Sequence, residues 1–223
     1  EYAENDKIYV PVHKLNLIQK YIGSSEGTSL DSLKGGSWEK RKAKAKADVE
    51  KLAQELMEYQ AKRAMTPGHA FSKIDEDYIA FEDAFPFDET IDQLRAIKEI
   101  MSDMNQPKAM DRLLCGDVGF GKTEVAMRAA YRSILDGKQV AWLVPTTVLA
   151  HQHFRSLKER FSEFAANICI LDRSVTSASK ILEKLKKGEI DILIGTHRIL
   201  SKDIEFRDLG LLIVDEEQRF GVL

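Results

Sequence analysis

The stretch Gly116-Asp-Val-Gly-Phe-Gly-Lys-Thr123 fits the phosphate-binding loop pattern G-x-x-x-x-G-K-[S/T], and it decides the fold class. Glycines let backbone N–H groups turn toward phosphate oxygens, because no Cβ obstructs the approach. Helix formers occupy residues 124–130, so the N-terminus of a helix is expected to face the same anion. Lys122 is expected to reach the β- and γ-phosphates, and the Thr123 hydroxyl to ligate Mg²⁺. The sequence therefore predicts a site for a nucleoside triphosphate.

A second acidic element follows a strand near the end of the chain. The apolar run 209–214 is typical of a parallel strand buried on both faces, and Asp215-Glu216-Glu217-Gln218 comes directly after it. One carboxylate can hold the water shell of Mg²⁺, and its neighbour can orient or deprotonate the attacking water. We assign Asp215 to the metal and Glu216 to the water, which makes Lys122, Asp215 and Glu216 the predicted catalytic residues. The alternative is that these acidic residues only mark the end of a strand.

The region from about residue 71 onward alternates between the two periodicities of strands and helices. Strands are predicted at 111–115, 139–144, 167–171, 191–195 and 209–214, and helices at 89–103, 122–136, 147–162 and 177–187. This alternation predicts an α/β fold with a parallel sheet and helices on both faces. Right-handed crossovers would bring the loops 116–123 and 215–218 to one edge of the sheet, and Lys122 close to Asp215.

The first 70 residues have a different character. Residues 7–12 predict a β-strand, residues 15–21 a short packed segment, and the Ser- and Gly-rich residues 23–36 a loop. A long helix is predicted over 37–63, with an apolar stripe formed by Val49, Leu52, Leu56 and Tyr59. Its first turns carry five cations, namely Lys40, Arg41, Lys42, Lys44 and Lys46. They fit either a ridge that binds the DNA backbone or a solvated face with i,i+4 pairs, and we favour the solvated face.

Composition limits the other possibilities. The chain has 223 residues, 43% of them hydrophobic, and a net charge of −3, so no global basic field indicates nucleic acid. The two cysteines, Cys115 and Cys169, lack metal-ligand spacing and are predicted to be reduced and buried in strands. Neither a membrane span nor a signal peptide is evident, and a cytoplasmic location is expected. Because the chain starts at Glu1 without an initiator methionine, we expect a piece of a larger protein.

The motifs, taken in order, resemble those of superfamily 2 helicases and translocases. The loop 116–123 and Asp215-Glu-Glu-Gln-Arg-Phe-Gly221 resemble motifs I and II, and residues 144–152 and 194–197 resemble motifs Ia and Ib. Phe85-Pro-Phe87 with Thr90 and Gln93 resembles the adenine-recognising Q motif. Phe120 and the upstream region resemble the bacterial transcription-repair coupling factors, whereas RecG-type fork helicases usually carry serine at the position of Phe120. Gln218 is a departure, since histidine is commoner there.

The resemblance implies a RecA-like parallel sheet, preceded by a long connector helix and a partial β module. Residues 1–22 would be the end of an RNA-polymerase-interacting domain, 23–70 a loop and the connector helix, and 71–223 the first motor lobe. ATP and Mg²⁺ would be the cofactors. The nucleotide contacts would come from the Q motif and motif I, namely Phe87, Gln93, Gly116, Asp117, Val118, Gly119, Phe120, Gly121, Lys122, Thr123 and Glu124. Mg²⁺ would be held by Thr123 and Asp215.

The same resemblance implies partners. Thr146 and Thr147 of motif Ia, with Thr196 and His197 of motif Ib, would contact the backbone of double-stranded DNA; ordinary helix N-caps are the alternative. The full-length protein would contact the β subunit of RNA polymerase and repair factors, and no membrane. It would couple ATP hydrolysis to displacement of stalled polymerase and recruitment of repair. Because the second lobe would supply arginine fingers, the isolated chain is expected to be inactive.

Two other functions remain open at the level of sequence. One is a motor lobe of a RecG-like or replication-restart helicase. The other is a phosphate-loop fold that acts only as a scaffold for protein contacts. Binding of ATP that depends on Lys122 would separate both motor functions from the scaffold.

Overall fold

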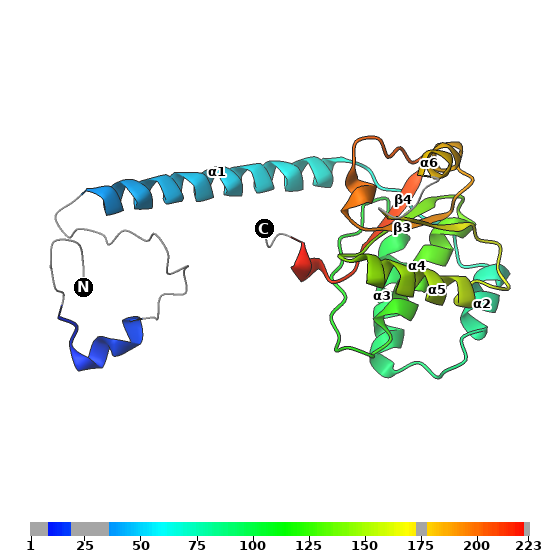
Figure 1. Ribbon diagram of the computed structural model, residues 1–223. Coiled ribbons are helices and arrows are strands. Elements are labelled where there is room, and N and C mark those ends of the chain that lie inside the picture. Colours follow the sequence, from blue (N-terminus) through cyan, green and yellow to red (C-terminus); the bar gives the residue numbers. More distant parts are fainter. Residues whose placement is uncertain (1–8, 19–35, 173–177, 221–223) are drawn as a thin grey trace. The chain divides into compact units, whose positions relative to one another are not determined.

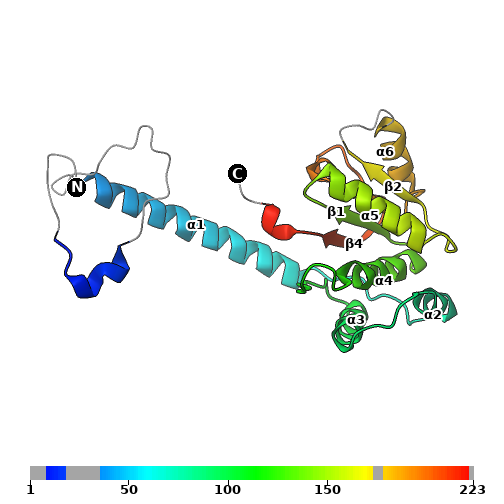
Figure 2. The same ribbon diagram turned by 60° about the horizontal axis from the view of Figure 1, so that its bottom comes forward.

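The computed structural model describes residues 9–18, 36–172 and 178–220, and the chain divides into two units, 1–65 and 66–223. In the second unit the order of elements is α2 (Glu76–Asp83), α3 (Ile91–Met104), α4 (Lys122–Leu135), β1 (Gln139–Leu143), α5 (Thr147–Arg160), β2 (Ile168–Leu171), α6 (Ala178–Lys187), β3 (Ile192–Gly195), η3 (His197–Leu200), β4 (Leu209–Val214) and η4 (Glu217–Arg219). Figure 1 and Figure 2 show this arrangement from two sides.

The sheet is parallel, with the strand order β2-β3-β1-β4 among the described residues. Alternation along β1 places Val140 and Trp142 in one hydrophobic cluster, and Ala141 and Leu143 in another. Helices α2 to α5 supply the first cluster, and α6 and η3 supply the second. The predicted α/β fold with helices on both faces of the sheet is therefore confirmed.

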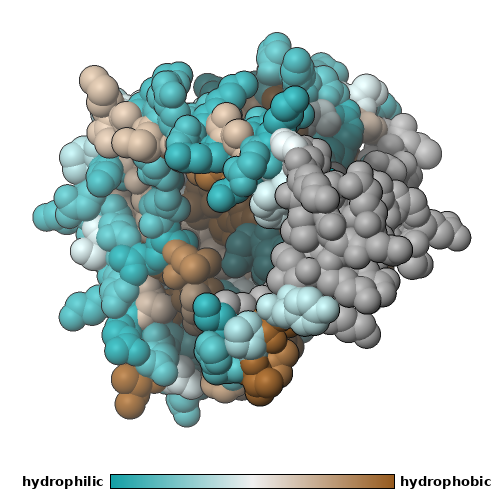
Figure 3. Space-filling model, turned by 90° about the vertical axis from the view of Figure 1, so that its left-hand side faces the viewer, coloured by the Kyte–Doolittle hydropathy of each residue, from teal (hydrophilic) through white to brown (hydrophobic). Residues whose placement is uncertain are grey.

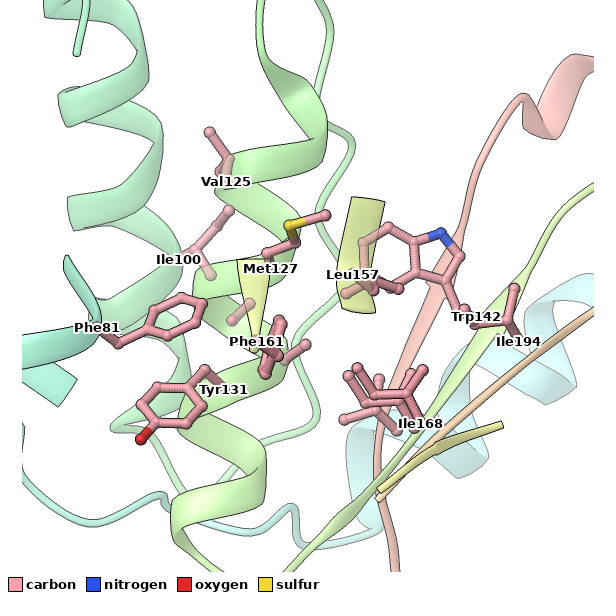
Figure 4. Close-up of a cluster of buried hydrophobic side chains, with 14 of the residues drawn as sticks. Phe81, Ile100, Val125, Met127, Tyr131, Trp142, Leu157, Phe161, Ile168 and Ile194 are labelled. Carbon is pink, nitrogen blue, oxygen red and sulfur yellow. The ribbon is translucent and has the colours of Figure 1, made fainter. Parts of the chain in front are cut away.

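Aromatic and aliphatic side chains together fill the first cluster (Figure 4). The Phe81 ring is fully buried, stacks on Tyr131 at a centroid distance of 4.2 Å and lies 4.9 Å from Phe161. Burial of one such side chain contributes roughly 1.5–3 kcal/mol. Phe81 belongs to α2, a helix that was not predicted from the sequence. The signal for its start is the N-cap residue Asp75, whose carboxylate accepts a hydrogen bond from the Tyr78 N–H at 2.9 Å.

The strand predicted at 111–115 is wrong, because these residues form no strand in the structure. Leu113 is 69% exposed, and Arg112 binds Asp103 at 2.7 Å and also Glu99, both on α3. A strand needs a neighbouring strand for its backbone hydrogen bonds, and among the described residues this segment has none. Cys115 is exposed for the same reason, contrary to prediction, whereas Cys169 lies half-buried in β2 and burial raises its pKa.

The first unit contains η2 (Val12–Leu17) and α1 (Ser37–Met65). The described part of the predicted strand 7–12 is not β-structure, since Pro11 directly precedes the 3₁₀ helix η2. Residues 7–8 and most of the predicted 23–36 loop lie outside the described residues. Helix α1 ends before Thr66-Pro67, as predicted. Its apolar stripe is exposed, and two i,i+4 pairs, Lys46–Glu50 and Lys51–Glu55, accompany the cations, as a solvated face requires.

The coloured part of the face in Figure 3 is largely hydrophilic, with separate hydrophobic patches. Among the described residues, no helix is both long enough and apolar enough to span a membrane.

Candidate functional site

The phosphate-binding loop leads directly into α4. Gly119 and Gly121 have φ values of 85° and 71°, which L side chains rarely adopt, and Gly121 is the N-cap of α4. The Lys122 ammonium donates hydrogen bonds to the carbonyl oxygens of Gly116 at 2.6 Å and Asp117 at 2.9 Å. The cation therefore lies on the backbone of its own loop, where an anion could replace these carbonyls as its partner.

Gln93 connects the predicted Q motif to this loop. Its side-chain oxygen accepts the Thr90 N–H at 2.8 Å, and the Thr90 hydroxyl accepts the Gln93 N–H at 3.2 Å, which forms a capping box at the start of α3. Its amide nitrogen donates to the Phe120 carbonyl at 3.0 Å. A Cβ on Gly121 would lie 2.2 Å from that nitrogen and would displace the Gln93 side chain, and the φ of 71° disfavours residues other than glycine there. The Phe87 ring is 71% exposed and makes an edge contact with Phe85 at 5.6 Å.

Asp215 lies at the carboxyl edge of the sheet. Its N–H donates to the Leu143 carbonyl at 2.9 Å, which continues the pairing of β4 with β1 by one residue. A hydrogen bond with His153 lowers the pKa of Asp215, and the positive charge of Lys122 lowers it further, although burial opposes both. Asp215 is therefore ionised near neutral pH, and among these effects that of Lys122 is the smallest. The hydroxyl-bearing Thr123 is half-buried in the first turn of α4.

Glu216 has a left-handed backbone conformation, with φ 54° and ψ 46°. Its carboxylate accepts a hydrogen bond from the Gln218 amide at 2.7 Å and lies 3.9 Å from the Arg219 guanidinium. Such strain in a residue other than glycine is common at functional sites. Gln218, the departure from the commoner histidine, thus contacts the carboxylate that we assigned to the attacking water.

The Glu124 side chain, in contrast, belongs to a buried ion-pair cluster that packs α4 against its neighbours. One of its oxygens accepts from Arg128 at 3.0 Å, and both accept from Arg160 at 3.0 Å. Arg128 is fully buried and also binds Glu82 at 2.7 Å and Glu89. The predicted contribution of Glu124 to the nucleotide site would therefore have to come from its backbone.

The predicted DNA contacts follow two neighbouring strands at the same edge. Thr146 comes after β1 and caps α5, because its hydroxyl accepts the Leu149 N–H at 3.3 Å. Thr147 is exposed in the first turn of α5. Thr196 comes after β3, and the exposed His197 ring lies 5.0 Å from Phe220. The capping role of Thr146 agrees with the structural alternative and leaves the exposed Thr147 hydroxyl available.

A family model described as "DEAD/DEAH box helicase" matches residues 90–223, more than half of the chain. The chain belongs to the DEAD/DEAH box helicase family. A second model, "CarD-like/TRCF RID domain", matches residues 1–22. This helicase chain is 52% identical to the transcription-repair-coupling factors of Borreliella burgdorferi over 225 residues and of Bacillus subtilis over 224 residues. These alignments cover 100% and 99% of the chain but only 20% and 19% of the two relatives. It thus corresponds to a segment of a coupling factor, and the resemblance noted in the sequence is confirmed.

A solved structure, RecG bound to a three-way DNA junction, is similar to this helicase chain with a TM-score of 0.68 and 39% sequence identity. The alignment covers 74% of the chain and 23% of the RecG chain. The RecG-like alternative is therefore not favoured, since the coupling factors match the whole chain at higher identity.

His153 and the two arginines of the ion-pair cluster, Arg128 and Arg160, were not predicted from the sequence. Ala150, His153 and Leu157 are spaced as one face of a helix, and all three are buried. That spacing could have indicated a histidine directed into the protein. No comparable signal connects Arg160 to Glu124, because 36 positions separate them.

Replacement of Gln93 tests the Q motif. If its amide reads adenine, guanine would leave polar groups unpaired at about 1–3 kcal/mol each, so we expect ATP to bind more tightly than GTP and Gln93→Ala to weaken that preference. Calorimetric titration with both nucleotides measures it, and Gln54→Ala on α1 is the matched control. Equal affinity of the unaltered chain for ATP and GTP would remove the basis for the assignment.

Proposed function

We propose that this chain is the ATP-binding lobe of a DNA translocase, the motor of a transcription-repair-coupling factor. The observation that carries the proposal is one of placement: α4, which begins at Lys122, packs on β1 and β4, and Asp215 follows β4 at the carboxyl edge of the same parallel sheet. A cation for phosphate oxygens and a carboxylate for a hydrated metal are thereby held together, as hydrolysis of a nucleoside triphosphate requires.

The side chains at this edge fit Mg²⁺ and ATP. Mg²⁺ prefers oxygen ligands and keeps several waters, and the ionised Asp215 carboxylate and the Thr123 hydroxyl are oxygen donors. Bound Mg²⁺ would neutralise charge on the phosphates. Gly119 and Gly121, with their positive φ values, allow the loop backbone to approach an anion closely, and Phe87 offers an exposed ring to a base.

The residues of the chain would divide the chemistry among them. Lys122 would exchange the carbonyls of Gly116 and Asp117 for phosphate oxygens. This change in the loop would alter the hydrogen bond that the Gln93 amide donates to the Phe120 carbonyl. Glu216 would accept a proton from, or orient, the attacking water after release from Gln218. Glu216 lies directly after Asp215, so the water-directed and the metal-directed carboxylates belong to consecutive residues of the chain.

Partners and domain organisation are part of the proposal. The chain spans about a fifth of the length of its relatives. We infer that residues 1–22 end an RNA-polymerase-interacting domain, 23–70 form a loop and connector, and 71–223 form the first motor lobe; the family matches at 1–22 and 90–223 support this division. Thr146, Thr147, Thr196 and His197 would contact duplex DNA, and the DNA-bound RecG relative supports a DNA partner. Contacts with the polymerase β subunit and repair factors would belong to the whole, cytoplasmic protein.

The experiment that tests the proposal is titration with Mg-ATP. Lys122→Ala should weaken binding by about tenfold to a hundredfold, as expected when a charged hydrogen-bond partner is lost, and leave the fold intact because Lys122 packs little. Lys138→Ala, which removes the same charge just before β1 at the opposite edge of the sheet, should bind normally. Unchanged binding by Lys122→Ala would exclude the loop as the site and favour a scaffold function.

A further inference from the structure

His153 lies on the buried face of α5. Its side chain is 10% exposed, and its ring centroid is 5.4 Å from that of the buried Trp142 on β1, with 38° between the ring planes. Leu157, one turn further along α5, belongs to the same hydrophobic cluster as Trp142, which Figure 4 shows. Packing on these sides limits the orientations that the imidazole can adopt.

The polar edge of this imidazole meets Asp215. His153 Nε2 lies 2.7 Å from Asp215 Oδ2, although 62 positions separate the two residues. An ionised carboxylate can only accept, so the imidazole is the donor through Nε2–H. This hydrogen bond and one from the backbone of Glu216 leave further lone pairs on the carboxylate for a magnesium-bound water.

Asp215 needs such support because its backbone hydrogen bond to the Leu143 carbonyl does not fix the orientation of its side chain. It follows β4, an edge strand in the described sheet, on which the preceding Val214 is 40% exposed. The chain turns away at once, since Glu216 is already left-handed. An aspartate with a free χ1 in this place would sample several rotamers, and a fixed donor selects one of them.

We propose that His153 is a positioning residue for Asp215, so that α5 fixes where the magnesium-directed carboxylate stands. The inference rests on the proposed function, because it assigns Asp215 to the metal. It adds a contact from the helix that carries most of motif Ia: α5 has Thr147 in its first turn and His153, the partner of Asp215, six residues later. Metal ligands are commonly oriented by hydrogen bonds of this kind, and their loss weakens metal binding.

The alternative is a purely structural histidine that uses Asp215 to satisfy a buried N–H. The two roles differ in which part of nucleotide binding they affect. A structural role would change stability, and nucleotide affinity with and without Mg²⁺ to the same extent. A positioning role would change only the gain in affinity that Mg²⁺ provides.

The test compares ATP affinity in Mg²⁺ and in EDTA by calorimetry, for the unaltered chain and for His153→Leu and His153→Gln. We expect His153→Leu to reduce the magnesium-dependent gain by about tenfold or more while affinity in EDTA stays the same. His153→Gln keeps an N–H donor and should recover most of the gain. His151→Leu is the matched control, since His151 is on the exposed face of α5 and pairs with Asp172 at 2.9 Å. Thermal unfolding of each variant reports the fold, and His153→Phe replaces His153→Leu if the latter does not fold.

An unaltered magnesium-dependent gain in His153→Leu would overturn the inference. So would a loss in His153→Gln as large as that in His153→Leu, because packing and not the donor would then be responsible. An unaltered chain that binds ATP without any gain from Mg²⁺ would instead overturn the metal assignment of Asp215, and the inference with it. These outcomes keep failure of the proposed function distinct from failure of the inference.

Discussion

The 223-residue chain is expected to hydrolyse ATP at or near the background rate, with no stimulation by duplex DNA. The described edge of the sheet offers a phosphate-directed cation and two carboxylates, Asp215 and Glu216. Arg219 is close to Glu216, but its guanidinium already faces that carboxylate from the same loop. In phosphoryl transfer an arginine that neutralises the transition state is worth roughly 10³–10⁵ in rate. We therefore expect extension of the chain to the length of its relatives to produce DNA-stimulated turnover of that order above the chain alone.

Steady-state phosphate release with and without duplex DNA measures this difference. In the extended protein, Glu216→Gln should abolish hydrolysis and spare ATP binding, whereas Glu217→Gln, the neighbouring carboxylate, should hydrolyse normally. Robust DNA-stimulated activity in the 223-residue chain would contradict the expectation. It would point to dimerisation that supplies the arginine from a second copy.

Arg128→Met is expected to lower the free energy of unfolding by about 3–5 kcal/mol, because breaking a buried ion pair leaves its carboxylates uncompensated. Arg128 is fully buried, and its partners Glu124, Glu89 and Glu82 are 8%, 23% and 36% exposed. Methionine fills much of the same volume, so loss of charge pairing dominates. Because the cluster joins α2 and residues 84–89 to α4, the region next to the Q motif should loosen with it.

Urea denaturation measures the change, with Arg198→Met as the control. Arg198 pairs with Asp203 at the surface, where such pairs are worth roughly 0–1 kcal/mol. A loss in Arg128→Met as small as in the control would mean that the cluster is not needed for stability.

The pH dependence of the free energy of unfolding gives a second check. The hydrogen bond from Arg128 lowers the pKa of Glu89 below its ordinary value of 4.5, so its stabilising contribution is present above that value and is lost as the pH falls through the folded-state pKa. Arg128→Met should lose this part of the acid dependence.

Much of the motor lobe could be predicted from local sequence. The helix after the phosphate loop begins at Lys122, as its residues predict, and four predicted strands occur within one or two residues of their expected bounds. Periodicity is a local property, so it survives without knowledge of the partners. The rule that parallel strands end at the same edge predicted Lys122 near Asp215, but in the structure 111–115 is not a strand, and it is the packing of α4 on β1 and β4 that brings Lys122 to this edge.

The predicted strand at 111–115 shows where local pattern is insufficient. Leu113 and Leu114 are apolar enough for a strand, but strand formation depends on a hydrogen-bonding neighbour that hydropathy does not reveal. In the structure the charge of Arg112 instead holds this segment to α3.

The phosphate loop, its helix and the alternation of a parallel sheet can be predicted from the amino-acid sequence, because each depends on residue types within one element. The contacts of His153 with Asp215, of Gln93 with Phe120 and of Arg128 with three carboxylates are known only from the folded chain. Each of these contacts joins residues on different elements, and its geometry depends on how the helices pack over the sheet. The residues of the candidate site can therefore be proposed from the chain alone, whereas the support of that site depends on packing between elements distant in sequence.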